Sequence, residues 1–187
     1  MPDKKKVEEA AREFVRSLFP DFESNPNLVD TPKRIAKMYC DEVFSGSFVE
    51  PPKVTVFPND RNYDQLIIVP KIEFSSTCAH HFLPFIGTVV IGILNEQKSF
   101  AGFSKYHRIV DWYARRPQVQ ENLTQEIADY LFDVLKPKGV GVMIRANHMC
   151  ARVRGVRQPN PEMITTALKG NLHKAEVKEE FLRACYA

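Results

Sequence analysis

Apolar residues in the first part of the chain recur with a helical period. Over residues 3–18 their spacing is near 3.6 residues, which is typical of an amphipathic helix. Its apolar positions are Val7, Ala11, Phe14, Val15 and Leu18. A second helix is expected to begin at Thr31-Pro32, where a capping residue precedes a proline, and to end near Gly46. Residues 47–65 then carry three prolines, which predict an irregular linker.

From residue 66 onward, short strand-like runs are interleaved with helical patterns. Strands are expected over residues 66–76, 87–94 and 140–146, with residues 151–156 as a hairpin partner of the last. Helices are expected over residues 104–116, from Pro117 to about residue 135, and over residues 174–184. This order favours an α+β fold, an antiparallel sheet with helices on one face. We therefore expect an N-terminal helical segment, residues 1–50, before a larger domain, residues 51–187.

Composition excludes several classes of protein. The 187 residues are 44% apolar and 26% charged, which is enough to build a core and argues against disorder. No apolar run approaches the ~18 residues of a membrane helix, and the N-terminus lacks the apolar region of a signal peptide. A net charge of +3 does not point to nucleic acid. We expect a cytoplasmic protein that binds neither membrane nor nucleic acid.

Cysteine and histidine are rare but clustered. The chain has four Cys and five His, and most of them fall in Cys78-Ala-His80-His81 and His148-Met-Cys150. A disulfide is one interpretation, although an intracellular chain normally keeps its thiols reduced. Packing in the core is another, because free cysteine buries like a small apolar residue. We assign this second interpretation to Cys40 and Cys185, which lie outside the clusters.

Metal binding is the third interpretation of the clusters. Thiolate and imidazole ligands together favour zinc. If His148 to Cys150 is extended, both side chains point to one face, and a turn is needed for Cys78 to meet His81. Spacing alone does not choose which histidine binds, nor whether the site is structural or catalytic. The clusters hold five candidate ligands for four positions around zinc, so at least one imidazole stays free for proton transfer. Zinc can also lower the pKa of a bound water molecule to about 7.

Several ordered segments between Thr31 and Phe181 make the chain resemble GTP cyclohydrolase I. They are Thr31-Pro-Lys-Arg-Ile-Ala-Lys-Met-Tyr39, Ser76-Thr-Cys-Ala-His-His81, Gly102-Phe-Ser-Lys105, Arg115-Arg-Pro-Gln-Val-Gln-Glu-Asn-Leu-Thr124 and His148-Met-Cys-Ala-Arg-Val-Arg-Gly155. The resemblance implies the tunnelling (T) fold, with residues 51–187 as its catalytic domain. It also implies a homodecamer with active sites between subunits.

The same resemblance assigns roles to individual residues. The implied zinc ligands are Cys78, His81 and Cys150, and the implied acid and base are His80 and His148. Gln120 and Glu121 match residues that hold the guanine, and a carboxylate suits its N1 and N2 donors. The matched triphosphate contacts are Ser104, Lys105, Arg108 and Arg154, with Arg34 and Lys37 as a further pair. Ser104 is also expected to cap a helix whose N-terminus attracts anions.

The implied reaction converts GTP and water to 7,8-dihydroneopterin triphosphate and formate, the first step of folate and pterin biosynthesis. One departure is Ala79, where the family usually has Glu beside the metal ligand. Two alternatives stay open at this point. One is the related T-fold enzyme of queuosine metabolism, which reduces a nitrile with NADPH. The other is a module that binds GTP or a pterin around a structural zinc.

Overall fold

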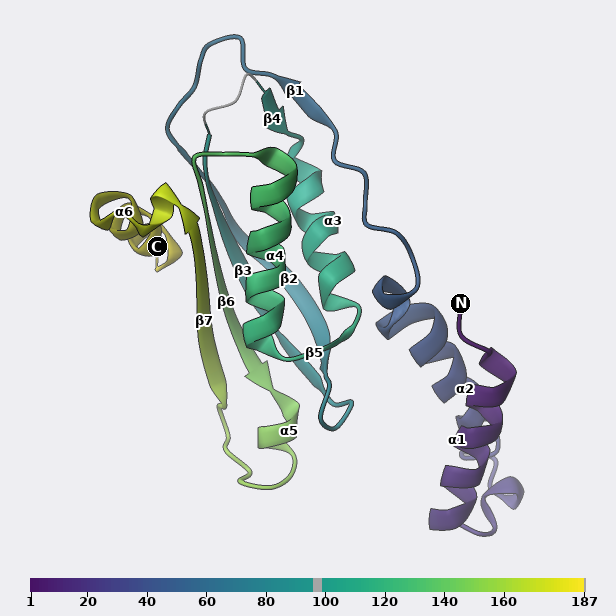
Figure 1. The fold of residues 1–187 in the computed structure, drawn as a ribbon. Helices are drawn as coiled ribbons and strands as arrows, with labels where there is room; N and C mark the ends of the chain where they lie inside the picture. Colours follow the sequence, from purple (N-terminus) through teal and green to yellow (C-terminus); the bar gives the residue numbers. More distant parts are fainter. Residues whose placement is uncertain (96–98, 187) are drawn as a thin grey trace. The chain divides into compact units, whose positions relative to one another are not determined.

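Helices build the N-terminal unit, Met1–Glu50, of the computed structural model, which describes residues 1–95 and 99–186 (Figure 1). Helix α1 spans Lys4–Leu18, and the Asp3 side chain caps it by accepting a hydrogen bond from the Lys6 amide. Helix α2 spans Thr31–Lys37 and continues as a wider π-helical turn, Met38–Val43. The α1 helix and the helix start at Thr31 are therefore both confirmed.

The second unit, Pro51–Ala187, contains a five-stranded sheet with the order β5-β2-β3-β6-β7. The four long strands are antiparallel to their neighbours, and the short β5 runs parallel to the end of β2. The strands are β2 (Leu66–Cys78), β3 (Pro84–Leu94), β5 (Pro117–Gln118), β6 (Gly139–His148) and β7 (Glu162–Gly170). Strands β1 (Val56–Pro58) and β4 (Ser99–Ala101) pair separately.

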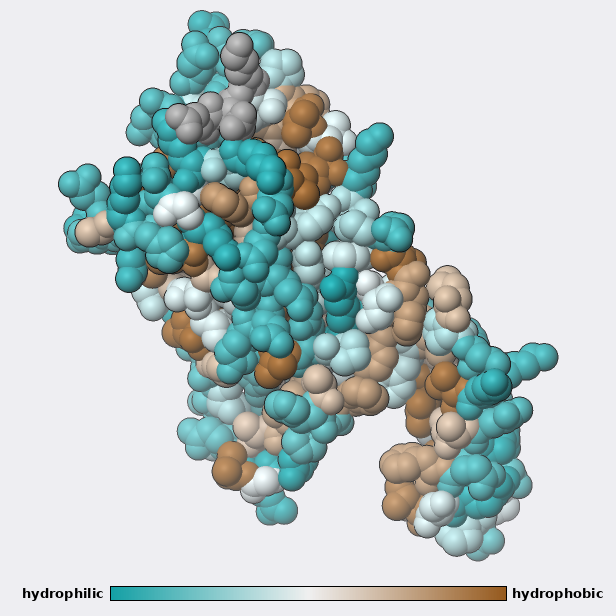
Figure 2. All heavy atoms as spheres, viewed as in Figure 1, coloured by the Kyte–Doolittle hydropathy of each residue, from teal (hydrophilic) through white to brown (hydrophobic). Residues whose placement is uncertain are grey.

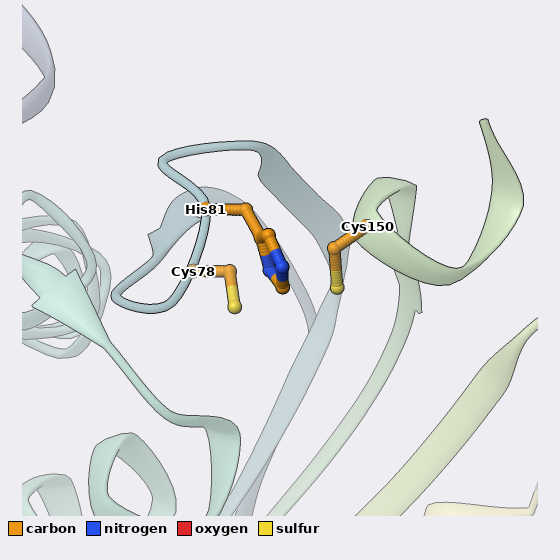
Figure 3. A group of neighbouring side chains, drawn as sticks. All are labelled: Cys78, His81 and Cys150. Carbon is orange, nitrogen blue, oxygen red and sulfur yellow. The ribbon is translucent and has the colours of Figure 1, made fainter. Parts of the chain in front are cut away.

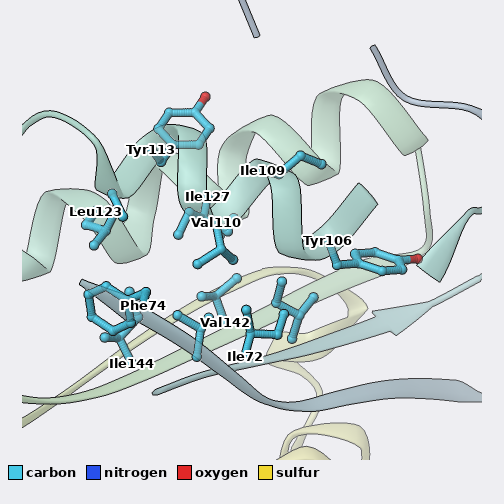
Figure 4. Packing of buried hydrophobic residues seen from close by; sticks show 14 of the residues in the cluster. Ile72, Phe74, Tyr106, Ile109, Val110, Tyr113, Leu123, Ile127, Val142 and Ile144 are labelled. Carbon is cyan, nitrogen blue, oxygen red and sulfur yellow. The ribbon is translucent and has the colours of Figure 1, made fainter. Parts of the chain in front are cut away.

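The two faces of the sheet bury alternate residues, as the pleat of a strand requires. Helices α3 (Phe103–Ala114) and α4 (Gln120–Leu135) cover one face, where Ile72, Val142 and Ile144 pack beneath them (Figure 4). Helix α6 (Ala175–Cys185) instead places Phe181 on the opposite face with Val90 and Met143. The expected antiparallel sheet with helices on one face is thus confirmed for α3 and α4, and α6 adds a cover on the other side.

Two local expectations are wrong. Residues 151–156 form no strand, because the chain turns into the short helix α5 (Met149–Arg152) and the hairpin partner of β6 is β7. Helix α4 begins at Gln120 rather than at Pro117, because Pro117 and Gln118 pair with Thr77 and Cys78. Proline lacks an N–H donor and is tolerated in such an edge strand.

Apolar side chains are exposed on one side of the N-terminal unit. Figure 2 shows mostly hydrophilic side chains over α4, and both hydrophilic and apolar side chains on the N-terminal unit. There Phe14, Leu18 and Phe19 are each more than half exposed. Within residues 1–95 and 99–186, no helix has both the length and the apolar character needed to cross a membrane.

Candidate active site

Two chain segments bring three metal-binding side chains together at one end of the sheet (Figure 3). Cys78 is the last residue of β2, His81 lies in the turn toward β3, and Cys150 lies in α5 just after β6. Their ligand atoms all lie within 4.8 Å of one another. The turn is closed by a hydrogen bond of 2.9 Å from the Phe82 amide to the Cys78 carbonyl. These three residues, called the metal trio below, can hold one ion.

The donor chemistry of the metal trio suits a cation such as zinc. Burial raises the pKa of the Cys150 thiol, and the neighbouring Cys78 raises it further. Two adjacent thiolates are therefore unfavourable unless a cation compensates them. All four cysteines are free, so the disulfide interpretation is excluded. The condition of an extended His148–Cys150 segment is not met, since helix α5 begins at Met149 and itself carries Cys150 to the site.

The other two histidines of the clusters, His80 and His148, lie within two residues of a member of the metal trio. The Nδ1 atom of His80, which is exposed, lies 3.8 Å from the Cys78 sulfur. His148 ends β6 and pairs with Phe85 across the ladder. Its ring stacks on Phe85, with centroids 4.7 Å apart and planes 1° from parallel. Burial lowers the pKa of His148, and the Glu121 carboxylate partly opposes this. A partly buried imidazole that favours its neutral form is suited to accept a proton.

Gln120 and Glu121 begin α4 but face different surroundings. Glu121 is exposed, as a residue that binds a base must be. The Gln120 side chain has 0% exposure, and its amide nitrogen donates to the carbonyl oxygens of Ile144 and Met163. Its amide oxygen lies 2.8 Å from His148 Nε2. In this arrangement the Gln120 side chain faces the interior and His148.

The cations of α3 lie away from the metal trio. Gly102, and not Ser104, caps α3, so Ser104 and Lys105 occupy its first turn. Tyr106 in that turn lines a cavity with Ile67 and Ile93, at the far end of β2 and β3 from Cys78. The helix then runs toward the site, where the Ala114 carbonyl accepts from Ser76. Ten residues of helical rise separate Ser104 from Ala114, about 15 Å.

The other cations are divided between the two units. Arg154 is exposed and its Nη1 lies 2.8 Å from His81 Nε2, so it lies directly against the metal trio. Arg108 is exposed one turn into α3, and neither it nor Lys105 has an acidic partner within the described parts of the chain. Arg34 and Lys37 lie on α2, where each has an acidic neighbour, Asp30 and Glu42 respectively.

Several residues around His148 carry no signal in the sequence. Phe85 precedes the expected strand, residues 87–94, and only the observed register pairs it with His148. Thr165 of β7, which contacts the Gln120 amide at 3.1 Å, lies 45 positions from it. These contacts depend on long-range strand pairing, which residue spacing does not reveal.

The comparison with protein families decides where this arrangement belongs. The family model described as GTP cyclohydrolase I matches residues 7–186. The chain belongs to the GTP cyclohydrolase I family. It is therefore an enzyme of a hydrolase family, and its α+β architecture is consistent with the tunnelling fold.

Relatives in this family cover nearly the whole chain. A GTP cyclohydrolase 1 of Streptomyces coelicolor is 40% identical over 179 residues, 95% of this chain and 88% of the relative. One of Wolinella succinogenes is 42% identical over 92% of this chain and 94% of its own. The apo crystal structure of the archaeosine synthase QueF-Like aligns with 56% of this chain and 93% of its own, at 16% identity and a TM-score of 0.44.

Proposed function

We propose that the protein converts GTP and water to 7,8-dihydroneopterin triphosphate and formate, with zinc in the metal trio. The observation that carries this proposal is the metal trio, with His148 two residues before its member Cys150. Cys78, His81 and Cys150 supply three ligands that lie within 4.8 Å of one another. Three protein ligands leave one position of a tetrahedral ion for water or substrate, as catalytic zinc sites do. Zinc bound there would supply Lewis acidity and a water molecule with a pKa near 7.

His148 and His80 would move the protons of this reaction. Opening the imidazole ring of guanine requires a proton at N7 as water adds to C8, and the later rearrangement of the ribose requires further transfers. His148 is partly buried and favours its neutral form, whereas His80 is exposed beside Cys78. Two imidazoles in different surroundings suit successive donation and acceptance of protons.

Glu121 would orient the base. It is exposed at the first turn of α4, and Gln120 beside it contacts His148. Its carboxylate can accept hydrogen bonds from guanine N1 and N2, which distinguishes guanine from bases without those donors. Recognition by Glu121 would place C8 and N7 near His148 and the metal trio.

The triphosphate would require residues from another copy of the chain. Arg154 lies at the metal trio, but Ser104 and Lys105 lie at the opposite end of α3. Arg108, Arg34 and Lys37 are further exposed cations that match the family's phosphate contacts. A homo-oligomer, a decamer by the family pattern, would bring cations of one copy to the metal trio of another. The exposed apolar residues Phe14, Leu18 and Phe19 are suited to such contacts.

The wider setting follows from the same proposal. The product is the precursor of folates and other pterins, so the protein would act at the first step of that biosynthesis, in the cytoplasm. Ala79 lies between Cys78 and His80 and takes no part in the proposed chemistry.

Three variants test the proposal through formate release and bound zinc. Cys150→Ser should lose both, because it removes a ligand, whereas Cys185→Ser should keep both. His148→Ala should keep zinc and lose turnover. Full turnover by Cys150→Ser would refute the scheme. Loss of zinc in His148→Ala would make His148 a ligand instead, and zinc with GTP binding but no turnover in the unmodified protein would identify a binding module.

A further inference from the structure

The Gln120 side chain makes a complete set of hydrogen bonds in the interior. Its Nε2 carries two hydrogens and lies within hydrogen-bond distance of three acceptors, the Ile144 carbonyl at 3.2 Å, the Met163 carbonyl at 3.0 Å and the Thr165 hydroxyl at 3.1 Å. Its Oε1 lies 2.8 Å from His148 Nε2. The side chain is fully buried, so these contacts replace its interactions with water.

The orientation of this amide follows from its partners. Carbonyl oxygens only accept hydrogen bonds, so the NH₂ group must face Ile144 and Met163. Rotating the amide by 180° would place its oxygen against the Ile144 and Met163 carbonyl oxygens, and none of these three oxygens would then receive a hydrogen bond from the amide. The oxygen of Gln120 therefore faces His148. Because that oxygen can only accept, His148 Nε2 must carry a hydrogen.

Two threonines hold the amide in place. Thr124 Oγ1 donates to the Gln120 backbone carbonyl at 2.7 Å, which uses its single hydrogen. The contact of 2.6 Å between the two threonine hydroxyls must then use the hydrogen of Thr165. Thr165 thus donates to Thr124, and its oxygen adds a third acceptor beside the two amide hydrogens of Gln120. Every donor in this group has an acceptor within reach, and the amide is not free to rotate.

The imidazole plane is fixed from a second direction. Phe85 is fully buried and stacks on His148 with planes 1° from parallel. The hydrogen bond from Nε2 sets the rotation of the ring within that plane. Together Phe85 and Gln120 leave Nδ1 as the ring nitrogen without a fixed protein partner among residues 1–95 and 99–186.

We propose that Gln120 is a positioning residue that holds His148 as the Nε2–H tautomer, so that Nδ1 is the nitrogen that exchanges protons with the substrate. This differs from a role in guanine binding, which would then belong to Glu121. The tautomer is a property of the protein alone, whereas the role of Nδ1 in proton exchange rests on the proposed function.

Neutron diffraction on deuterium-exchanged crystals of the zinc-loaded protein at pH 8 tests the tautomer directly. The inference predicts deuterium on His148 Nε2 and none on Nδ1, with both amide deuterons of Gln120 on the side of Ile144 and Met163. Deuterium on Nδ1, or an amide turned the other way, would overturn it. This result does not depend on activity, so it separates the failure of this inference from the failure of the proposed function.

Kinetics of Gln120→Leu test the positioning role. We expect kcat for GTP to fall about ten- to a hundredfold, with bound zinc retained and KM within about threefold of the unmodified value. A raised KM with unchanged kcat would instead identify a guanine contact and overturn the proposal. Gln118→Leu is the matched control: Gln118 is also buried and donates to a carbonyl, that of Tyr113, but contacts no histidine. It should lose stability without the loss in kcat.

Discussion

Phe181 is the residue on which the attachment of α6 to the sheet most depends. Its ring has no exposed area and lies over two glycines of neighbouring strands. A Cβ atom at Gly92 would lie 2.6 Å from the ring, and one at Gly141 would lie 2.9 Å from it. Because the ring lies directly on these glycines, the strands beneath it contribute no side chain at Gly92 or Gly141 to fill its place. We therefore predict that Phe181→Ala leaves a cavity that does not close.

The magnitude follows from this burial. Removing a fully buried phenylalanine ring costs about 3–5 kcal/mol of unfolding free energy. For a chain of this size, each 1 kcal/mol lowers the melting temperature by about 2–4 °C. The variant should therefore melt about 6–20 °C below the unmodified protein in a thermal scan followed by circular dichroism. Zinc content at 10 °C should be unchanged, since the metal trio lies beyond the other end of β3.

Tyr186→Ala provides the control for this experiment. Tyr186 is also aromatic and directly follows α6, but it is 64% exposed, so its loss should shift the melting temperature by less than about 2 °C. A loss below about 1 kcal/mol in Phe181→Ala would refute the packing argument. So would equal effects of the two substitutions.

Three further predictions concern charge and recognition. Zinc should protect Cys150 from labelling by iodoacetamide, and removal of zinc by a chelator should restore the labelling. Burial raises the pKa of the Cys185 thiol to about 11, so Cys185 should react slowly at pH 8 with or without zinc. Mass spectrometry of labelled peptides measures both rates, and labelling of Cys150 that zinc does not slow would contradict this prediction. Hydrogen bonds from Arg12 and Arg16 lower the pKa of Glu23 below 4.5, so their stabilisation is present above pH 4.5 and is lost as the pH falls through the folded-state pKa. Urea unfolding of Glu23→Gln at pH 7 and pH 3 should therefore show a weaker pH dependence than the unmodified protein, and an equal dependence would contradict the pairing. Inosine triphosphate lacks the N2 donors, so its kcat/KM should be about tenfold or more below that of GTP. The Glu121→Gln variant should show a smaller ratio between the kcat/KM values of the two substrates. An unchanged ratio would show that Glu121 does not recognise the base.

Local periodicity was sufficient to predict most helices and strands. Helix α1 and strands β2, β3 and β6 each carry a continuous local pattern of apolar residues. The failures occur where distant segments decide the structure. Residues 151–156 have strand-like composition, yet β7 takes the place beside β6. Proline is common at the first position of a helix, but Pro117 is extended because it pairs with Thr77 in the sheet.

The candidate site likewise has a part that the sequence predicts and a part that depends on distant segments. The clustering of Cys78, His81 and Cys150 was visible in the sequence, and the turn between Cys78 and His81 was a condition that the structure meets. The contacts of the Gln120 side chain were not visible in the sequence. They depend on carbonyl groups of β6 and β7 beneath the first turn of α4, and so on the packing of a helix against two strands.

We propose that this protein, with zinc in the metal trio, opens the guanine ring of GTP. Incubation of the zinc-loaded protein with GTP, followed by oxidation, dephosphorylation and detection of neopterin fluorescence, tests this most directly. We expect neopterin in an amount equal to the formate released, and neither product from Cys150→Ser. GTP left unchanged by zinc-loaded, folded and oligomeric protein would contradict this proposal.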